Sequence, residues 1–377
     1  MDTTLQRNIV ISAVNLRKGG TLTVLRNCLQ YLSGREDLHV TALVHDRGLC
    51  DFPGIDYIEI PWSVRSWAHR LWCEYVTMRR ISARLPKTDL WLSLHDTTPN
   101  VKALRQAVYC HTAFPFMTPT LQDLRMDFKI VLFSRLTRFA YRINVRRNRY
   151  LIVQQDWMRR KMSKLLGFPA GRIIVAPPSF RPLPLGEGDS RSEPGMTKGA
   201  PGMTVFLYPA TADAHKNFET LCEAARILEH RVGKGTFLVK LTISGDENTY
   251  AAYLRHKWAD VDSICFNGLM SREALGKAVA GAAALVFPSR AETWGLPITE
   301  FLPTGKPMLL ANLPYAYETA AGAQLAAFFP VADAVRLADL MQEVMARSLT
   351  SFGPVPGRKY NEPYAANWKE LFALLLK

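Results

Sequence analysis

Two glutamates with a fixed spacing are the residues whose type and context best suit chemistry. Both lie in the segment P-S-R-A-E-T-W-G-L-P-I-T-E, residues 288–300, with Glu292 inside it and Glu300 at its end. The apolar run before the segment predicts a buried parallel strand, and Pro297 is typical of the first turn of a helix. Such an element presents free backbone N–H groups and a positive dipole end, which bind phosphate. Because acids beside phosphate would repel it, we interpret both glutamates as ligands of sugar hydroxyls.

Each glutamate also has a plainer interpretation. Glu300 is expected in the first turn of the helix, where an acid complements the helix dipole. Glu292 is expected in the loop, where a solvated acid needs no special role. The pair, with the G-L-P between its members, is what favours the functional interpretation.

A second motif opens a helix in the same half of the chain. A-T-A-D-A-H-K-N, residues 210–217, follows a predicted strand and places Lys216 at the helix start. A cation is unfavourable there, so a diphosphate bound nearby would explain it. Asn267 and Gly268 end a later strand, near the expected edge of a nucleobase.

The N-terminal half offers a glycine pair and one histidine. Gly19 and Gly20 lie between a predicted strand and a predicted helix, which suits phosphate as well as it suits an ordinary turn. His111 follows another apolar strand. A lone histidine in that position is more often structural than catalytic.

Composition predicts a two-domain α/β protein. The chain has 377 residues with 48% hydrophobic content, and no apolar run is long enough to span a bilayer. Short apolar runs alternate with helical patterns in both halves, which predicts doubly wound parallel sheets. We predict an N-terminal domain, a Pro/Gly-rich linker, a second domain and a C-terminal tail with a helix, at residues 1–176, 177–203, 204–350 and 351–377.

The strands and helices are expected at definite places. Predicted strands lie at 9–15, 40–44, 56–60, 90–94, 107–110, 151–153, 172–175, 205–208, 237–243, 264–266, 285–287 and 307–310. Predicted helices include residues 157–166, 218–231, 250–258, 272–280 and 368–376. Because the carboxyl ends of parallel strands share one edge, the two domains are expected to face a central cleft.

The motifs in residues 208–319 resemble those of retaining GT-B glycosyltransferases of the GT4 family. The resemblance rests on H-K-N, I-S-G-D, F-N-G-L, P-S-x-x-E-x-x-G-L-P-x-x-E and N-L-P-Y-A-Y-E. It implies a GT-B fold of two Rossmann-like domains, of which residues 1–176 would bind the acceptor and residues 204–350 the nucleotide sugar. It also implies transfer of a hexose from a GDP- or UDP-sugar to a glycan or lipid-linked acceptor, in bacterial lipopolysaccharide, O-antigen or exopolysaccharide synthesis.

The resemblance also implies roles for single residues. Glu292 would hold the donor sugar, Lys216 the diphosphate, and Glu300 the ribose. The amides of Gly295 and Leu296 would face the phosphate or the sugar. The looser match at residues 15–22 places Gly20, with Gly19, at the diphosphate, and His111 resembles the family's cleft histidine. The catalytic residues would then be Glu292, His111 and Lys216.

One departure concerns the phosphate ligands. Many family members carry an arginine after the strand that ends at Tyr208, but this chain reads Y-P-A-T there. Lys216, helix ends, Arg290 or Arg17 would have to meet the phosphate charge. We expect no metal and no other cofactor, because Lys216 and helix ends would stabilise the phosphate charge that a metal ion stabilises in other folds. The resemblance also implies that the leaving phosphate takes the acceptor's proton.

The charge is concentrated in the N-terminal half. The net charge of +14 arises from residues 1–176, whereas the remainder is neutral. Residues 62–84 and 125–149 interleave arginines with aromatic residues, and the second segment would line its cations along one helix face. Such helices lie on anionic membranes, so we expect a cytoplasmic protein at the inner face of the plasma membrane.

Two other classes of protein fit parts of the sequence. A non-catalytic lipid- or polymer-binding protein on a degenerate GT-B scaffold would not need both glutamates and Lys216. A nucleic-acid binder is suggested by the pI of about 9.6, but the chain carries no recognisable nucleic-acid-reading motif. We therefore expect a nucleotide-sugar donor, a glycan or lipid-linked acceptor and no nucleic acid.

Overall fold

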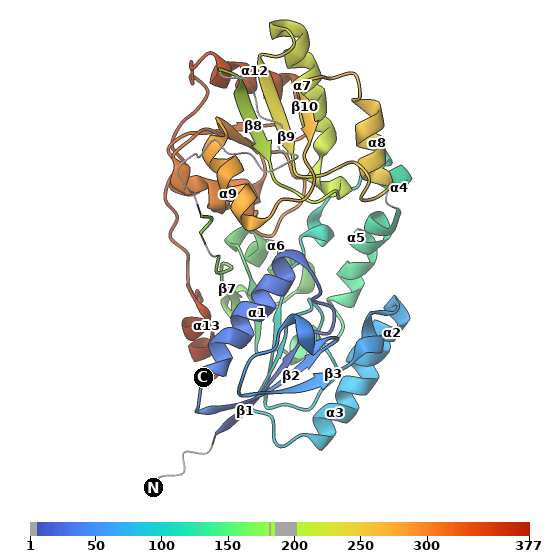
Figure 1. The fold of residues 1–377 in the computed structure, drawn as a ribbon. Coiled ribbons are helices and arrows are strands. Elements are labelled where there is room, and N and C mark those ends of the chain that lie inside the picture. Colours follow the sequence, from blue (N-terminus) through green and yellow to red (C-terminus); the bar gives the residue numbers. More distant parts are fainter. Residues whose placement is uncertain (1–5, 127, 181, 185–201) are drawn as a thin grey trace. The chain divides into compact units, whose positions relative to one another are not determined.

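The computed structural model describes residues 6–126, 128–180, 182–184 and 202–377. The chain forms two compact units, each built around one parallel sheet (Figure 1). Unit 1 comprises Met1–Phe116, Phe133–Ser179 and Tyr360–Lys377, and unit 2 comprises Met117–Leu132 and Phe180–Lys359. Most of the predicted linker at 177–203 lies outside the described residues.

Unit 1 contains seven strands in the order β3-β2-β1-β4-β5-β6-β7. All neighbouring strands are parallel, and the order reverses between β1 and β4. The strands are β1 (Arg7–Ser12), β2 (Leu38–Val44), β3 (Ile55–Glu59), β4 (Leu90–Ser93), β5 (Arg105–Tyr109), β6 (Tyr150–Val153) and β7 (Ile173–Val175). Each overlaps a strand predicted from the sequence, and the prediction of a doubly wound sheet is confirmed.

The helices of unit 1 cover both faces of this sheet. They are α1 (Gly19–Ser33), α2 (Trp67–Trp72), α3 (Met78–Arg84), α6 (Asp156–Leu166) and α13 (Trp368–Leu375). A π-helical turn, η3 (Cys73–Thr77), joins α2 to α3. Alternate residues of β1 point to opposite faces of the sheet. Ile9 and Ile11 belong to one buried cluster and Val10 to another.

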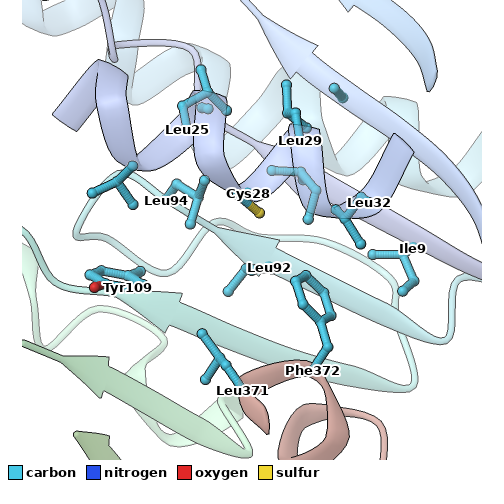
Figure 2. Packing of buried hydrophobic residues seen from close by; sticks show 14 of the residues in the cluster. Ile9, Leu25, Cys28, Leu29, Leu32, Leu92, Leu94, Tyr109, Leu371 and Phe372 are labelled. Atoms are coloured by element: carbon cyan, nitrogen blue, oxygen red, sulfur yellow. The ribbon is translucent and has the colours of Figure 1, made fainter. Parts of the chain in front are cut away.

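One face of the unit 1 sheet is covered jointly by α1 and α13. Leu25, Leu29 and Leu32 project from one side of α1, as the helical period requires, and are at most 1% exposed. Phe372 of α13 lies in the same cluster (Figure 2). Its ring stacks on Tyr31 of α1. The last helix is therefore part of the unit 1 core, although it follows all of unit 2 in the sequence.

Unit 2 contains six parallel strands in the order β10-β9-β8-β11-β12-β13. They are β8 (Thr204–Tyr208), β9 (Phe237–Leu241), β10 (Ile264–Phe266), β11 (Ala284–Phe287), β12 (Met308–Ala311) and β13 (Ala326–Phe329). Their helices are α4 (Leu121–Met126), α7 (Phe218–Val232), α8 (Thr249–Lys257), α9 (Arg272–Gly281), α10 (Leu296–Phe301), α11 (Pro314–Thr319) and α12 (Ala334–Met345). Neither β13 nor α12 was predicted from the sequence.

Two segments are grouped with a unit that their sequence position does not suggest. Residues Met117–Leu132, between β5 and β6 of unit 1, belong to unit 2 and carry α4. Residues Tyr360–Lys377 belong to unit 1. From the sequence, the first segment was expected in the N-terminal domain and the second in a C-terminal tail.

The expected line of arginines on one helix does not form. Helix α5 (Phe128–Ala140) ends before Arg142, and Asn144 takes a left-handed φ of +58°. Arg138 and Arg142 donate hydrogen bonds to the carbonyls of Pro115 and Leu165. The prediction failed because these cations serve backbone carbonyls at the end of the helix. None of the described helices is long and apolar enough to cross a bilayer.

Candidate functional site

The predicted strand–loop–helix element is present in unit 2. Strand β11 is fully buried and leads through a loop into α10, with Pro297 near the helix start. Gly295 takes a φ of +91° immediately before the helix, and a Cβ there would approach the Ile298 side chain at 3.3 Å. Glycine therefore suits this position both for its backbone and for its packing. Glu300 lies beyond the first turn of α10, not within it as predicted.

Lys216 and Glu292 lie in direct contact. The Lys216 Nζ donates to the Glu292 Oε1 at 2.6 Å, and the two side chains are 16% and 13% exposed. Both were predicted as site residues from motifs 76 positions apart. The structure thus places a cation and an anion in contact beyond the carboxyl ends of β8 and β11.

Lys216 is held by the short helix η7 (Ala214–Lys216). Its carbonyl accepts a hydrogen bond from the Tyr208 hydroxyl at 2.7 Å. The next residue, Asn217, has a left-handed φ of +58° and donates to the Pro288 carbonyl at 3.0 Å. This amide joins the H-K-N motif to the start of the glutamate loop, so the two motifs form one rigid site.

His215, beside Lys216, is also buried. Burial lowers its pKa to about 4, and the charge of Lys216 acts in the same direction. Its carbonyl accepts from the backbone N–H of Arg290 at 2.8 Å. The histidine is therefore neutral near pH 7 and contributes to the site mainly through its backbone.

Arg290 is bound to groups of the protein. Its guanidinium forms a bidentate ion pair with Asp123 of α4, with one contact of 2.8 Å from Nη1 to Oδ2. It also donates to the Ala214 carbonyl at 3.0 Å. Arg290 was one of the groups proposed to meet the phosphate, and in this structure its charge is met by a carboxylate.

Asp123 was not identified from the sequence. Its side chain is 1% exposed and also accepts from the Thr120 backbone N–H at 2.7 Å. Burial raises its pKa, but the hydrogen bonds from Arg290 and Thr120 outweigh burial, so its pKa is lowered. Asp123 and Arg290 are far apart in the sequence, and no motif near either residue indicates that they are paired.

Glu300 is paired with Arg272 of α9. The two side chains approach at 3.3 Å, and Glu300 is 12% exposed while Arg272 is half exposed. Burial raises the pKa of Glu300, and Arg272 partly opposes that effect. A carboxylate in this position can accept hydrogen bonds from a diol, as the predicted ribose role requires.

Asn267 and Gly268 lie where β10 ends. Their backbone N–H groups donate to Leu241 and Ile243, and Gly268 has a φ of +75°. The Asn267 Oδ1 is buried and has no hydrogen-bond partner among the described residues. It lines a pocket together with Lys240. An acceptor without a partner is consistent with a role in binding a ligand.

The predicted glycine loop is present in unit 1. Helix α1 begins at Gly19, whose φ is +65°, and Gly20 occupies its first turn. A Cβ on Gly19 would meet nothing within 4 Å, so packing does not demand glycine there. Its left-handed backbone is the local reason for glycine.

His111 follows β5 in unit 1, and its imidazole stacks on the Tyr109 ring at 4.5 Å. Burial lowers its pKa to about 3, and the neighbouring His95 lowers it further. Neither ring nitrogen forms a hydrogen bond within the described part of the chain. The Leu94 carbonyl lies near the ring and partly opposes the effect of burial on its pKa. The ring is therefore neutral near pH 7, with one donor and one acceptor nitrogen.

The structure places Lys216, Asn267, Gly268, Glu292 and Glu300 in unit 2, and Gly19, Gly20 and His111 in unit 1. Within unit 2 the direct contact is between Lys216 and Glu292. The cleft between the units and the role of each site residue stay predictions.

The architecture of the two units is the GT-B fold. Solved structures with this architecture align over nearly the whole chain. A sucrose-phosphate synthase from Thermosynechococcus elongatus is 15% identical, with a TM-score of 0.59 over 92% of both chains. WaaG, a glycosyltransferase involved in lipopolysaccharide biosynthesis, is 14% identical, with a TM-score of 0.61 over 90% of this chain and 91% of that one. Anabaena Alr3699/HepE, solved with UDP and glucose, is 13% identical, with a TM-score of 0.61 over 91% of each chain.

More specific similarity is confined to unit 2 and its surroundings. Residues 198–352 match the family described as "Glycosyl transferases group 1". This segment is less than half of the chain, but it contains Lys216, Asn267, Glu292 and Glu300. No curated protein matches the chain at a significant level.

Proposed function

We propose that this protein is a retaining glycosyltransferase of the GT4 type. It would move a hexose from a GDP- or UDP-sugar to a glycan or a lipid-linked acceptor. The contact of 2.6 Å between Lys216 and Glu292 carries the proposal. It joins the two strongest sequence motifs inside the segment that matches the glycosyl transferases group 1 family.

The charges of this pair suit the two ends of the bond that would break. During transfer the anomeric carbon loses its bond to the diphosphate oxygen, and negative charge grows on the leaving phosphate. Lys216 would stabilise that charge. Glu292 would hold sugar hydroxyls and favour the positive character of the ring in the transition state.

Retention requires the acceptor oxygen to attack from the side that the phosphate leaves. The acceptor hydroxyl would form the new bond to the anomeric carbon, and its proton would pass to the leaving phosphate. No protein carboxylate acts as nucleophile in this scheme, and no metal is needed, because Lys216 and backbone N–H groups meet the phosphate charge. Glu300 would bind the ribose, and Asn267 with Gly268 would border the base.

His111 and the glycine pair would act from unit 1. A neutral imidazole, with one donor and one acceptor nitrogen, can hydrogen-bond a sugar hydroxyl at neutral pH without adding charge. Gly19 and Gly20 would allow a diphosphate to approach the backbone closely.

A screen of donors tests this proposal. The purified protein is incubated with each common GDP- and UDP-hexose and candidate acceptors, and release of the nucleoside diphosphate is measured. NMR of the product then gives the anomeric configuration. Release that is absent with every donor, or a product of inverted configuration, would contradict the proposal.

We further propose that unit 1 contacts an anionic membrane at the cytoplasmic face, where a lipid-linked acceptor of surface polysaccharide synthesis would be found. Trp67 and Trp72 of α2 are 53% and 56% exposed, and Phe139 of α5 is 64% exposed. The Trp67 ring contacts Phe133 at 5.3 Å, which joins α2 to α5. Exposed aromatic rings beside arginines suit a lipid headgroup layer.

A further inference from the structure

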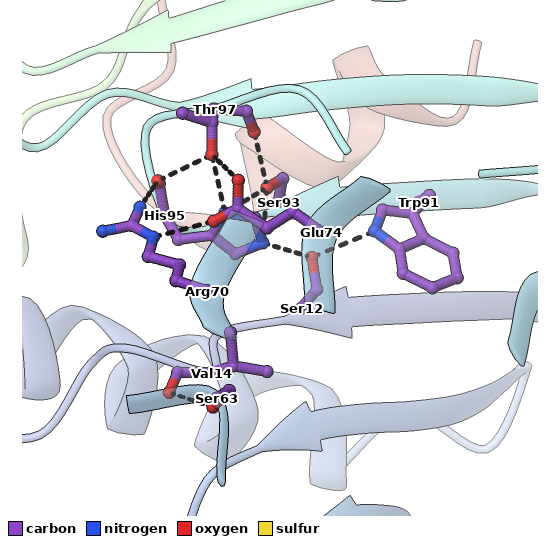
Figure 3. A network of polar contacts seen from close by, with 9 residues as sticks. All are labelled: Ser12, Val14, Ser63, Arg70, Glu74, Trp91, Ser93, His95 and Thr97. Carbon is purple, nitrogen blue, oxygen red and sulfur yellow. Dashed lines mark hydrogen bonds and ion pairs between the residues drawn. The ribbon is translucent and has the colours of Figure 1, made fainter. Parts of the chain in front are cut away.

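A buried polar network occupies the carboxyl ends of β1 and β4, where the strand order of unit 1 reverses (Figure 3). Open α/β sheets bind ligands at this point. Hydrogen bonds and ion pairs link Ser12, Arg70, Glu74, Trp91, Ser93, His95 and Thr97. Of these residues only Arg70 was expected to have a role, as one of the cations of the basic segment 62–84, and here it is mostly buried and paired with Glu74.

Glu74 is the centre of the network. Its side chain and that of His95 are both 0% exposed. The Glu74 carboxylate accepts from Arg70 Nε at 2.8 Å and from the Thr97 hydroxyl at 2.6 Å, and His95 Nδ1 lies at 3.2 Å. Burial alone would raise the pKa of Glu74, but His95 and Arg70 lower it to about 2. The carboxylate is therefore charged, and its contacts with Arg70, Thr97 and His95 offset the cost of burying that charge.

The network holds His95 at its ring and at its backbone. The ring Nε2 lies 3.0 Å from the hydroxyls of Ser12 and Ser93. The carbonyl of His95 accepts from Arg70 Nη2 at 2.7 Å. The position and direction of the peptide bond that follows His95 are therefore fixed.

That peptide leads into Asp96, which has a left-handed φ of +70°. An aspartate in this conformation is uncommon and strained, and it persists only where its surroundings impose it. The conformation directs the Asp96 carboxylate to the backbone N–H of His111, which donates to Oδ1 at 2.5 Å. A strained residue thus connects the network to the predicted catalytic histidine.

We propose that Asp96 is a positioning residue for His111, and that the Arg70–Glu74–His95 network keeps Asp96 in its strained conformation. The role in transfer rests on the proposed function, because it assumes that His111 acts there. The positioning itself does not, since it concerns one hydrogen bond and one ring.

The cost of the network supports this role. A buried ion pair is often no more stable than well-packed apolar residues of the same volume, so stability alone does not explain it. What an apolar core could not supply is the directed bond to the His95 carbonyl, and with it the strain at Asp96.

The surroundings of His111 define what a change at Asp96 would do. The groups near His111 are the stacked Tyr109 ring, His95 and the Leu94 carbonyl, with Asp96 at its backbone N–H. Cys110, Tyr141 and Arg70 face Asp96 in turn. Burial is the main reason why the pKa of His111 is low. If loss of the Asp96 hydrogen bond lets the ring move toward solvent, the pKa of His111 should therefore rise.

Three substitutions separate the strain from the hydrogen bond. Asp96→Asn keeps an acceptor for the His111 N–H and tolerates the left-handed backbone. Asp96→Gly relieves the strain but removes the acceptor, and Asp96→Ala removes the acceptor and keeps the strain. Asn144→Ala is the matched control, because Asn144 has a φ of +58° in the same unit and is not among the groups that face His111.

The first readout needs no activity. Protons on the imidazoles of the eight histidines are followed by NMR from pH 4 to pH 8, with the His111 signal assigned by its loss in His111→Gln. In the wild type, in Asp96→Asn and in Asn144→Ala, His111 should not titrate above pH 5. In Asp96→Gly and Asp96→Ala its pKa should rise toward the ordinary value of about 6.5.

The second readout is transfer itself. The glycine and alanine variants should lose roughly tenfold to hundredfold in kcat with unchanged affinity for the nucleoside diphosphate, and asparagine should restore most of that loss. If activity instead follows thermal stability, so that Asn144→Ala is as impaired as Asp96→Ala, the positioning role is wrong. A His111 signal unchanged in the glycine variant would also overturn it, whatever the donor screen shows.

Discussion

The Nζ of Lys216 and the Oε1 of Glu292 are 2.6 Å apart, in a site where both side chains are mostly buried. Opposite charges at this distance and burial stabilise each other strongly. A bound donor would contact Lys216 through its phosphate and Glu292 through its sugar hydroxyls. These two interactions would replace the one between Lys216 and Glu292. Substitution of either partner should change how the other meets the donor.

Glu292→Gln should preserve the fold but lose most transfer. The loss of a charged hydrogen bond that strengthens in the transition state should cost about 2–4 kcal/mol, a decrease of roughly 30-fold to 1,000-fold in kcat. Affinity for the nucleoside diphosphate should be unchanged or tighter, because Lys216 loses its competing partner. Isothermal titration and steady-state rates test this. Transfer within a few-fold of the wild type would contradict the role of Glu292.

Lys216→Ala should weaken binding of the donor and slow transfer together. The diphosphate carries charge in the ground state, and that charge grows in the transition state. The measurement is the affinity for the nucleoside diphosphate together with kcat. The double variant with Glu292→Gln supplies the cycle, in which the two losses should not add, because the residues are in contact. Unchanged affinity in Lys216→Ala would show that Lys216 does not touch the diphosphate.

Asp123→Ala should destabilise unit 2 although α4 is short. The change leaves the Arg290 guanidinium, which is 15% exposed, without its carboxylate, and breaking a buried pair costs about 3–5 kcal/mol. Asp262→Ala is the control, because its pair with Lys234 is exposed and should contribute at most about 1 kcal/mol. Urea unfolding followed by tryptophan fluorescence measures both. Equal effects would show that the Asp123 pair is no stronger than a surface contact.

The same pair predicts a dependence of stability on pH. The pKa of Asp123 is lowered in the folded protein, so its contribution is complete above the unfolded pKa of about 4. The contribution is lost as the pH falls through the lower, folded value. The difference in unfolding free energy between wild type and Asp123→Asn should therefore be constant from pH 5 to pH 7 and shrink below pH 4. A difference that does not shrink in acid would argue against a charged Asp123.

Membrane association should depend on exposed cations and aromatic residues, and not on the arginines that bind carbonyls. Arg80, Arg135 and Arg146 are exposed, so their reversal to glutamate should abolish sedimentation with anionic vesicles without unfolding the protein. Each cation near such a surface contributes about 1 kcal/mol. Vesicles of neutral lipid and a titration with salt are the controls. Binding that survives both the triple reversal and high salt would exclude an electrostatic membrane contact.

The motifs predicted most of the unit 2 site because each lies in a short segment where a strand ends and a helix begins. Glu292 and Lys216 could be identified from their own neighbours, and the parallel sheet then brings their loops together. Asp123 and Asp96 could not be identified in this way. Each acts through a partner distant in the sequence, Arg290 for one and His111 for the other, and single aspartates in polar loops carry no periodic signal.

The strands of both sheets could also be predicted from short segments of sequence. The arginine-lined helix expected within residues 125–149 was predicted wrongly. Buried strands such as β4 are nearly continuous apolar runs, whose pattern survives any detail of packing. The arginines between residues 135 and 149 were assigned to one helix face by their spacing alone, but spacing does not show where a helix ends. The end is set by local backbone conformation at Asn144 and by carbonyls that need donors.

The position of α13 in the unit 1 core has a consequence for synthesis of the protein. During translation the seven strands of unit 1 leave the ribosome well before Leu371 and Phe372, which complete one face of their core. Until then Leu29 and its neighbours on α1 lack part of their packing, and unit 2 has time to fold first. The first unit to be synthesised would thus be the last to be completed, and removal of the final eighteen or so residues would leave its apolar face open to chaperones and aggregation.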